Sequence, residues 1–317
     1  MTTILITGGS GFLGKRLGMA LGARGHRVVL AGRNNKQNML AGQMTGCPTL
    51  PLDVSRIESV RDVVAEVQPS IIIHAAATKF VDLSEDQPME AIDVNVTGSQ
   101  NVARVAIDKG VGLVIGISTD KASPPVRNTY GLTKALMERL FCSLDARGGT
   151  RFQCVRYGNV AWATGSVLPI WRGMLAKTGV IQTTGPEMHR YFFTVDEAVA
   201  LVLTALDRTA ELHGTVLARA MKAAQMEDVL KVWTSLVPGR YERIAGRAGD
   251  RNEELLIGEQ ELPYTRVESY GGVPHYVISF NRKVDTPLTE TLSSATAPRL
   301  STDEIAALLT HPPVEEQ

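Results

Sequence analysis

Five residues near the middle of the chain have the types and spacing needed for redox and acid–base chemistry. Thr119, Asp120 and Lys121 are consecutive, and Tyr130 and Lys134 follow at positions i and i+4 of a predicted helix, so they share one face. A nearby ammonium favours tyrosinate, which can take the proton of an alcohol while hydride leaves the same carbon. Thr119 can hydrogen-bond the same oxygen. The pattern predicts oxidation of an alcohol; an ordinary amphipathic helix is the alternative.

Asp120 and Lys121 predict a second step beside the new ketone. A ketone acidifies the neighbouring C–H, so a base can remove that proton while an acid protonates a departing hydroxyl. Lys121 could be this base and Asp120 this acid, provided that burial gives Asp120 a proton and removes one from Lys121 near neutral pH. A simple ion pair in a loop is the alternative.

A glycine-rich segment near the N-terminus predicts a dinucleotide site. Gly8, Gly11 and Gly14 have the spacing G-x-x-G-x-x-G between an expected strand and an expected helix. Small residues let the backbone approach a pyrophosphate, and the helix N-terminus presents free N–H groups to it. A glycine turn without a ligand is the alternative. The other expected cofactor contacts are Ser10, Phe12, Leu13, Asn34, Val54, Ala75, Ala76, Ala77, Asn95, Tyr130, Lys134 and Tyr157.

The segment after the second expected strand favours NADP over NAD. An NAD site usually has an acid here for the ribose 2′-hydroxyl, and residues 31–36 contain none. Arg33 and Lys36 could instead bind a 2′-phosphate; the alternative is that both are solvated loop cations. Asp53 could accept a hydrogen bond from the adenine amine or cap the helix before Ser55.

The composition indicates a globular protein without a polyanionic partner. The chain has 317 residues, of which 44% are hydrophobic, enough for one large or two modest domains. Lys+Arg and Asp+Glu both number 33, so no basic field argues for nucleic acid or an anionic membrane. We expect no membrane span and no signal peptide. Three cysteines and six histidines lack ligand spacing, so we expect no metal site and reduced thiols in a cytoplasmic protein.

Predicted strands and helices alternate through the first half of the chain. Strands are expected at 4–6, 27–30, 49–52, 71–73, 113–117 and 152–155, and helices after the glycine segment and at 57–67, 88–108 and 129–144. Apolar strands alternating with helices indicate a parallel sheet covered on both faces, and right-handed crossovers make it a Rossmann-like doubly wound α/β fold.

The later part of the chain predicts a second, smaller α/β unit. We expect residues 1–160, with about 190–210, to form an NADP-binding domain, and residues 161–189 and 211–285 to form a substrate-binding domain. Residues 286–317 are expected to be a connector and a final helix, which Ser301 and Glu304 cap.

The motifs resemble those of the extended short-chain dehydrogenase/reductase superfamily. Within it, the chain resembles the polysaccharide-biosynthesis group of UDP-N-acetylglucosamine 4,6-dehydratases, including the C5-inverting enzymes. The most specific segment is Ser118 to Ala122, because its Asp-Lys pair separates this group from most sugar-nucleotide epimerases. The matching segments span residues 4–9, 74–79, 95–102, 118–122, 130–134, 156–160 and 188–199.

The resemblance implies a nucleotide-sugar 4,6-dehydratase acting on UDP-N-acetylglucosamine or a close relative. In such an enzyme Tyr130 helps oxidise C4, Lys121 takes the C5 proton, Asp120 helps expel the C6 hydroxyl as water, and hydride returns to C6. Protonation of the opposite face would invert C5. It also implies a homo-oligomer, in which the helices at 91–108 and 132–144 pack between subunits. The substrate contacts that it implies are Lys79, Asn159, Val167, Arg190 and Arg247, and Asn95 would line the same cleft.

Departures from the family pattern lie in the substrate half. Residues 161–164 replace a Gly-Ser-Arg-like stretch, and Glu253-Glu254 stands where His-Glu is common. We therefore expect the reaction class to be kept more closely than the sugar. One alternative is a nucleotide-sugar epimerase or reductase on the same fold, which needs Tyr130 but not Lys121. A remote alternative is a non-catalytic NADP-binding protein, against which the intact Thr119, Tyr130 and Lys134 argue.

Overall fold

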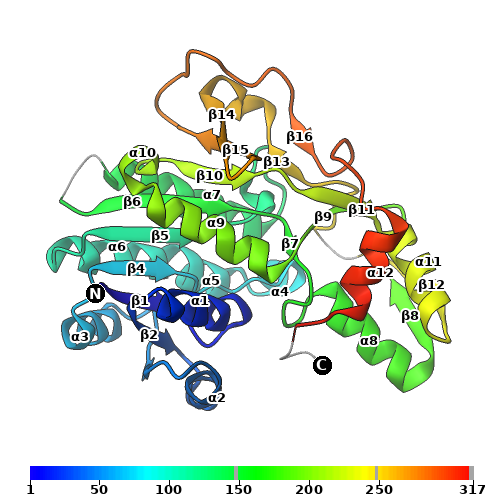
Figure 1. Cartoon of the computed structure of the whole chain (residues 1–317), viewed down its shortest axis with the longest axis horizontal. Helices are drawn as coiled ribbons and strands as arrows, with labels where there is room; N and C mark the ends of the chain where they lie inside the picture. The colour runs from blue at the N-terminus through cyan, green and yellow to red at the C-terminus, as the bar shows by residue number, and fades with distance from the viewer. Residues whose placement is uncertain (146–148, 247–248, 314–317) are drawn as a thin grey trace.

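The computed structural model describes residues 1–145, 149–246 and 249–313, and a large sheet forms its centre (Figure 1). Among these residues the sheet has nine strands in the order β14-β15-β10-β6-β5-β4-β1-β2-β3. The pairing is parallel from β3 to β10 and antiparallel at β15 and β14. The strands are β1 (Thr3–Thr7), β2 (Arg27–Gly32), β3 (Thr49–Pro51), β4 (Ile71–His74), β5 (Leu113–Ile117), β6 (Arg151–Arg156), β10 (Val216–Arg219), β14 (Thr265–Tyr270) and β15 (Val273–Ile278).

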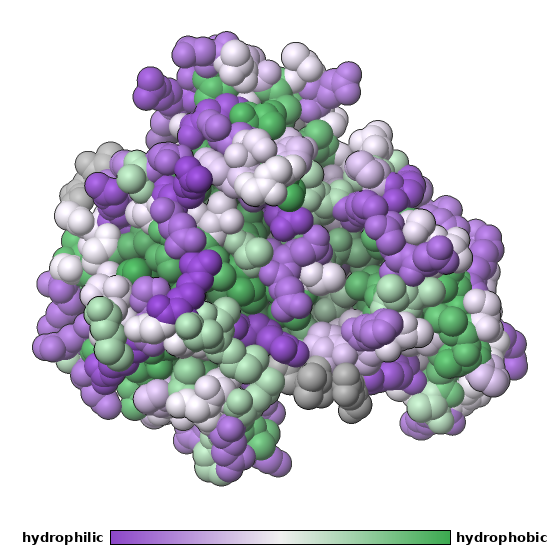
Figure 2. Space-filling model, viewed as in Figure 1, coloured by the Kyte–Doolittle hydropathy of each residue, from purple (hydrophilic) through white to green (hydrophobic). Residues whose placement is uncertain are grey.

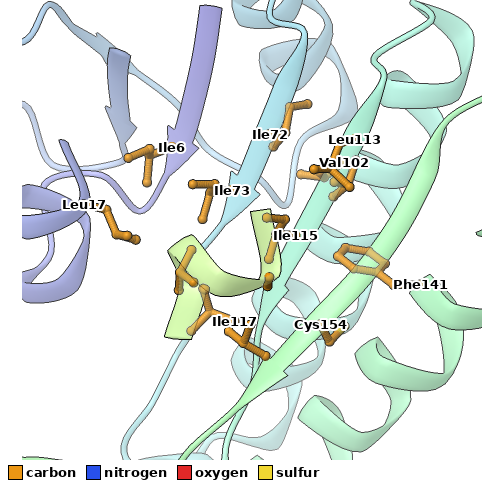
Figure 3. Packing of buried hydrophobic residues seen from close by; sticks show 14 of the residues in the cluster. Ile6, Leu17, Ile72, Ile73, Val102, Leu113, Ile115, Ile117, Phe141 and Cys154 are labelled. Atoms are coloured by element: carbon orange, nitrogen blue, oxygen red, sulfur yellow. The ribbon is translucent and has the colours of Figure 1, made fainter. Parts of the chain in front are cut away.

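The central strands are mostly apolar because helices cover both sides of the sheet. Every residue of β5 is buried, and Figure 3 shows Ile6, Ile73 and Ile115 of successive strands packed in one layer. The predicted doubly wound α/β fold is confirmed. The helices around the sheet are α1 (Phe12–Ala23), α2 (Asn35–Thr45), α3 (Ile57–Val67), α6 (Gly98–Asp108), α7 (Thr129–Leu144), α9 (Val195–Asp207) and α10 (Thr209–Leu212).

The long helix predicted at 88–108 is continuous but changes its winding in the middle. It consists of α5 (Pro88–Ile92), the π-helical turn η1 (Asp93–Thr97) and α6, and it follows the short α4 (Val81–Asp86). Such π-turns are frequent at functional sites. The wider turn directs Asn95 into the protein, where the side chain is 1% exposed. Asn95 Nδ2 donates to Thr133 Oγ1 and to the Thr78 carbonyl, so it ties the loop after β4 to α7.

The smaller part has its own apolar cluster, in which Trp162, Trp171 and Trp233 make edge-to-face contacts (right side of Figure 1). Its helices are α8 (Val167–Thr178), α11 (Met226–Leu236) and α12 (Thr302–Thr310), and Ser301 and Glu304 form the predicted capping box of α12. Its strands are β7 (Asn159–Val160), β9 (His189–Phe193) and β11 (Lys222–Gln225) in one sheet, the parallel pair β8 (Val180–Thr183) and β12 (Arg240–Arg243), and the antiparallel pair β13 (Leu255–Ile257) and β16 (Leu292–Ser293).

Three strands from the residues assigned to the substrate-binding unit belong to the main sheet. The sequence placed residues 211–285 in the smaller unit, yet β10 pairs with β6, and the hairpin of β14 and β15 extends that edge. A strand pattern predicts a strand but not its partner, because pairing depends on contacts far apart in the chain. This boundary was therefore misplaced for these strands.

The outer surface is mixed in character. On the face shown in Figure 2, hydrophobic residues are interspersed among hydrophilic ones. Within the described ranges, we find no helix that is both long and apolar enough to cross a membrane.

A buried ion cluster joins β6, α7 and the segment after β13. Arg156 is fully buried, and its Nη2 lies 2.6 Å from Glu138 Oε2 and 2.8 Å from Glu261 Oε1. Arg156 Nη1 also donates to the carbonyl of Leu256 in β13. Ser123 donates to Glu261 from the loop that follows Ala122. The cluster therefore holds β13 beside the end of β5.

Removing Arg156 is expected to destabilise the protein strongly. Arg156→Met would leave two buried carboxylates without their cation, which costs about 3–5 kcal/mol of unfolding free energy. Arg24→Met is the matched control, because Arg24 and Asp207 form an exposed pair worth about 0–1 kcal/mol. Urea unfolding followed by circular dichroism measures both variants. Equal unfolding midpoints would contradict the expected difference.

Candidate active site

A cavity of about 870 Å³ lies at the carboxyl ends of the central strands. Gly8 follows β1, Ala75 follows β4, Ser118 follows β5 and Tyr157 follows β6, and all four residues line the cavity. Open α/β sheets bind ligands at this edge, where the strand order reverses. Here the reversal lies at β1, between β2 and β4.

The glycine turn fits a dinucleotide closely. Gly8 has φ +68°, and a Cβ there would lie 2.7 Å from the nitrogen of Ala76. A Cβ on Gly14 would lie 2.6 Å from Gly9 Cα, so both positions require glycine. Helix α1 begins at Phe12 with Gly11 as its N-cap, which leaves N–H groups directed at the cavity. These residues would hold the pyrophosphate of a nicotinamide dinucleotide.

Most of the predicted contacts line this one cavity. Lys36, Asn95 and Asp120 do not line it, and Arg247 lies outside the described residues. The predicted residues that line the cavity are Gly8, Ser10, Gly11, Phe12, Leu13, Gly14, Arg33, Asn34, Asp53, Val54, Ala75, Ala76, Ala77, Lys79, Thr119, Lys121, Tyr130, Lys134, Tyr157, Asn159, Val167 and Arg190.

Two residues predicted to contact the cofactor, Asn95 and Lys36, do not line the cavity. Asn95 bonds to Thr78 and Thr133 and does not line the cavity, so its contact with the cofactor stays a prediction. Lys36, in the first turn of α2, is exposed to solvent.

The residues predicted to bind the adenosine part of the cofactor, Arg33, Asn34 and Asp53, also bond to neighbouring residues. Arg33 Nη1 lies 2.9 Å from Glu90 Oε1, and the arginine side chain is 65% exposed. The Asn34 side chain caps α2 by accepting from Gln37 N. Asp53 Oδ1 accepts from both the N–H and the hydroxyl of Ser55. This is a turn contact and not the helix cap given as its alternative role, because α3 begins at Ile57 with Arg56 as its N-cap. Arg33 pairs with Glu90 and lines the cavity, and it stays the predicted ligand of the 2′-phosphate.

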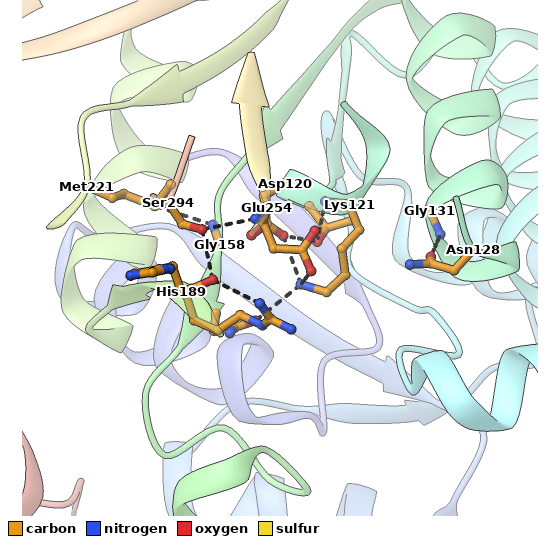
Figure 4. Close-up of polar contacts among 12 residues, drawn as sticks. Asp120, Lys121, Asn128, Gly131, Gly158, His189, Met221, Glu254 and Ser294 are labelled. Carbon is orange, nitrogen blue, oxygen red and sulfur yellow. Dashed lines mark hydrogen bonds and ion pairs between the residues drawn. The ribbon is translucent and has the colours of Figure 1, made fainter. Parts of the chain in front are cut away.

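Tyr130 occupies the first turn of α7, whose N-cap Asn128 accepts from Gly131 N (Figure 4). Burial raises the pKa of Tyr130 to about 12, while the charge of Lys121 and a hydrogen bond from Thr119 lower it. Burial lowers the pKa of Lys134 to about 8. The charge of Lys121 therefore favours tyrosinate, an effect that the sequence analysis assigned to Lys134.

Asp120 and Lys121 belong to the short turn η2 (Asp120–Ala122), which two residues separate from the end of β5. Lys121 Nζ lies 3.1 Å from Asp120 Oδ1 and 3.5 Å from Glu254 Oε1, and it donates to Asn159 Oδ1 at 3.3 Å (Figure 4). Burial lowers the pKa of Lys121, but the carboxylates of Asp120 and Glu254 outweigh this effect and raise it above the ordinary value. In the free protein the two carboxylates therefore keep the proton on Lys121, so burial does not supply the neutral amine that the predicted base role requires.

Among the three side chains that contact Lys121 Nζ, which are Asp120, Asn159 and Glu254, only Glu254 was not predicted from the sequence. It is 2% exposed, lines the cavity and directly precedes β13. Its only signal was a Glu-Glu pair at a position where the related motif has His-Glu. That pair gave no indication of contact with Lys121, which lies more than a hundred positions earlier in the chain.

The substrate side of the cavity combines cations with an apolar wall. Lys79 Nζ donates to the carbonyl of Thr164 at 2.6 Å, and Arg190 Nη1 donates to the carbonyl of His189. Val167 begins α8, and Trp171 of the same helix also lines the cavity. No group of three or more metal-ligating side chains occurs within the part of the chain that the structure describes.

Comparison with known proteins places the chain among nucleotide-sugar enzymes. A UDP-N-acetylglucosamine 4,6-dehydratase (inverting) of Campylobacter jejuni is 30% identical over 83% of this chain and 79% of the relative. A UDP-glucose 4-epimerase of Rickettsia bellii is 31% identical over 81% of this chain and 78% of the relative. The X-ray structure of Pen from Bacillus thuringiensis has a TM-score of 0.89 and 24% identity, covering 98% of this chain and 97% of that one, which shows a common fold.

The model of the polysaccharide biosynthesis protein family matches residues 4–272. This match and the dehydratase relative confirm the resemblance noted from the motifs. The chain therefore belongs to the polysaccharide biosynthesis protein family, on a fold of the short-chain dehydrogenase/reductase type.

Proposed function

We propose that this protein is a nucleotide-sugar 4,6-dehydratase, an NADP-dependent lyase that acts on UDP-N-acetylglucosamine or a close relative. The observation that carries the proposal is the position of Lys121, which lines the cavity and acts electrostatically on Tyr130. Oxidation alone needs Tyr130 and Thr119. An amine held by carboxylates beside that tyrosine supports a further proton transfer at the carbon next to the ketone.

The residues support a three-stage reaction. Tyr130, as tyrosinate, takes the C4 hydroxyl proton. Lys121, once neutral, takes the C5 proton, and a carboxylic acid of its group protonates the departing C6 hydroxyl. A nicotinamide dinucleotide held at Gly8, Gly11 and Gly14 would supply reversible hydride transfer, first from C4 and later to C6, so there would be no net redox change. Lys121 then returns a proton to C5, and protonation of the opposite face would invert that centre.

Mass spectrometry in heavy water tests this function. UDP-N-acetylglucosamine incubated with the protein and NADP should lose one water and gain deuterium at C5, without accumulation of NADPH. NMR of the product then shows whether C5 is inverted. If no nucleotide sugar in a panel loses water, the dehydratase assignment is contradicted.

A nucleotide-sugar epimerase or reductase on the same fold is the second candidate, and the similarity to the Rickettsia bellii epimerase favours it. Such enzymes use Tyr130 without needing Lys121. An isomer formed without loss of water would support an epimerase, and stoichiometric consumption of NADPH would support a reductase. Cofactor binding without conversion of any sugar would instead support a non-catalytic NADP-binding protein.

The preference for NADP should depend on Arg33. A hydrogen bond from a cation to the 2′-phosphate contributes about 1.5–3 kcal/mol, so Arg33→Ala is expected to weaken NADP binding roughly 10- to 100-fold. NAD binding should change little, because NAD has no 2′-phosphate. Isothermal titration with both dinucleotides measures this, with Lys36→Ala as the control outside the cavity. Equal losses for NADP and NAD would contradict the assignment.

We also propose a cytoplasmic homo-oligomer. Met89 and Ile92 on α5 and Leu132 and Leu136 on α7 are exposed, and these two helices are in contact. Apolar side chains gathered on neighbouring helices support packing against a second copy. The described cysteines, which include the buried Cys142 and Cys154, are free thiols, in keeping with a reducing compartment.

A further inference from the structure

We propose that Trp162 is a positioning residue for the nucleotide sugar, an assignment that rests on the proposed function. Its side chain anchors one wall of the cavity to the C-terminal helix α12. This wall segment (residues 161–166) connects β7 to α8 and lies between Asn159 and Val167, two of the predicted substrate contacts. All of its residues except Trp162 line the cavity, and residues 161–164 are those that depart from the family pattern.

The backbone of Trp162 has a conformation that bulky residues rarely adopt. The Ala163 N–H donates to the Val160 carbonyl and closes a four-residue turn. Of its two central residues only Trp162 has a positive φ, at +62°, which is the pattern of a type II turn, where glycine usually takes the third position. Gln68, the other described non-glycine residue with a positive φ, ends α3 on the surface, where this conformation is common. A bulky residue in such a conformation needs contacts that offset its cost, and such positions gather at functional sites.

The Trp162 side chain makes these contacts on the side away from the cavity. Its Nε1 donates at 2.7 Å to the carbonyl of Leu308, in the last turn of α12, where carbonyls lack a partner within the helix. The guanidinium of Arg172 in α8 lies 5.0 Å from the centre of the Trp162 ring. The residue is only 2% exposed. The indole therefore fixes the turn against α12 and α8.

The cavity side of the wall segment is in contact with the loop after β4. Lys79 Nζ donates to the Thr164 carbonyl. The Phe80 ring covers Gly165, where a Cβ would lie 2.6 Å from Phe80 Cε1. All four residues line the cavity. Because the turn carries the acceptor of Lys79, a shift of the turn would also move this predicted substrate contact.

The reacting amine and the cofactor site have supports of their own. Asn159, which accepts from Lys121 Nζ, belongs to β7, and β7 pairs with β9. The glycine turn is shaped by the close approach of Gly8 to Ala76. A change at Trp162 should therefore weaken binding of the nucleotide sugar while binding of NADP and the chemical steps are kept.

Trp162→Phe tests the anchor, because it keeps an aromatic ring in the cluster and removes the N–H that bonds to Leu308. We expect the KM for UDP-N-acetylglucosamine to rise about 3- to 30-fold, the effect of losing one hydrogen bond. The kcat and the Kd for NADP should stay within about threefold of the wild type, as for a loss of substrate binding alone. Trp162→Gly relieves the backbone but removes the whole anchor, so the KM of this variant should rise at least as much.

The matched control is Trp233→Phe, the same change in the same apolar cluster. Trp233 lies in α11, has an ordinary helical backbone and does not line the cavity. This variant should lower the urea midpoint as Trp162→Phe does, yet keep the wild-type KM. A role of Trp162 in stability alone would likewise lower the midpoint without changing the KM.

Hydrogen exchange followed by mass spectrometry measures the turn itself. The amides of residues 161–166 should exchange faster in Trp162→Phe than in the wild type or in Trp233→Phe. A wild-type KM in either folded Trp162 variant, or unchanged exchange in Trp162→Phe, would overturn the assignment. Equal rises in KM for Trp162→Phe and Trp233→Phe would overturn it as well, because they would show a general loss of packing. Wild-type protein that converts no nucleotide sugar would contradict the proposed function, while the exchange of the turn would still decide whether Trp162 anchors it.

Discussion

Lys121→Ala is expected to stop the loss of water while hydride transfer at C4 continues. The amine is the base for the C5 proton, so its removal should slow elimination about 10²–10⁴-fold. NADPH and a 4-keto sugar that keeps its C6 hydroxyl should accumulate, with little deuterium at C5. Absorbance at 340 nm and mass spectrometry in heavy water follow the two steps separately.

The control for this variant is Lys109→Ala, at the exposed end of α6. It should keep full dehydratase activity. The substitution Lys121→Ala leaves two buried carboxylates without their cation, so the integrity of the cofactor site has to be measured. Titration with NADP should show that the variant still binds the cofactor. Full dehydratase activity in Lys121→Ala would rule out Lys121 as the base for the C5 proton. An isomer formed at the wild-type rate without loss of water would instead favour the epimerase.

Tyr130→Phe is expected to prevent the first step and therefore every later one. Without the hydroxyl no base takes the C4 proton, so hydride transfer should fall about 10²–10⁴-fold. Burial raises the pKa of Tyr130 to about 12 in the free protein, so the phenol dominates at neutral pH. The rate of wild-type hydride transfer should rise with pH until the pH reaches the pKa of Tyr130 in the cofactor-bound enzyme. Since Lys121 lowers the pKa of Tyr130, Lys121→Ala should move this rise to higher pH.

Stopped-flow measurement of NADPH formation between pH 6 and about 10 checks the Tyr130 prediction. The pH range is limited because the stability of the folded protein itself depends on pH. Tyr241→Phe is the matched control, because its hydroxyl contacts Glu227 on the surface of the smaller part and it lies outside the cavity. Hydride transfer by Tyr130→Phe at the wild-type rate would mean that another group takes the C4 proton.

Local features of the fold could be predicted from the sequence because short-range patterns cause them. The strand at 113–117 and the helices at 57–67 and 129–144 have the predicted bounds. Gly8 and Gly14 are needed where the backbone turns against itself, and that requirement is visible in their spacing. Tyr130 shares its helix with Lys134, so helical periodicity alone brings both to the cavity.

The contacts that decide the chemistry depend on segments far apart in the chain. The sequence by itself determined the strands β1 to β6 of the sheet, the glycine turn and the order of Thr119, Asp120, Lys121 and Tyr130. Only the tertiary structure placed Glu254 on the cavity wall, buried Asp120 behind Lys121 and turned Asn95 inward. The physical reason is that burial, and the distance between two charges, depend on how distant segments pack. Packing through the Arg156 cluster and Ser294 brings β13 to the end of β5, and no local spacing encodes that approach.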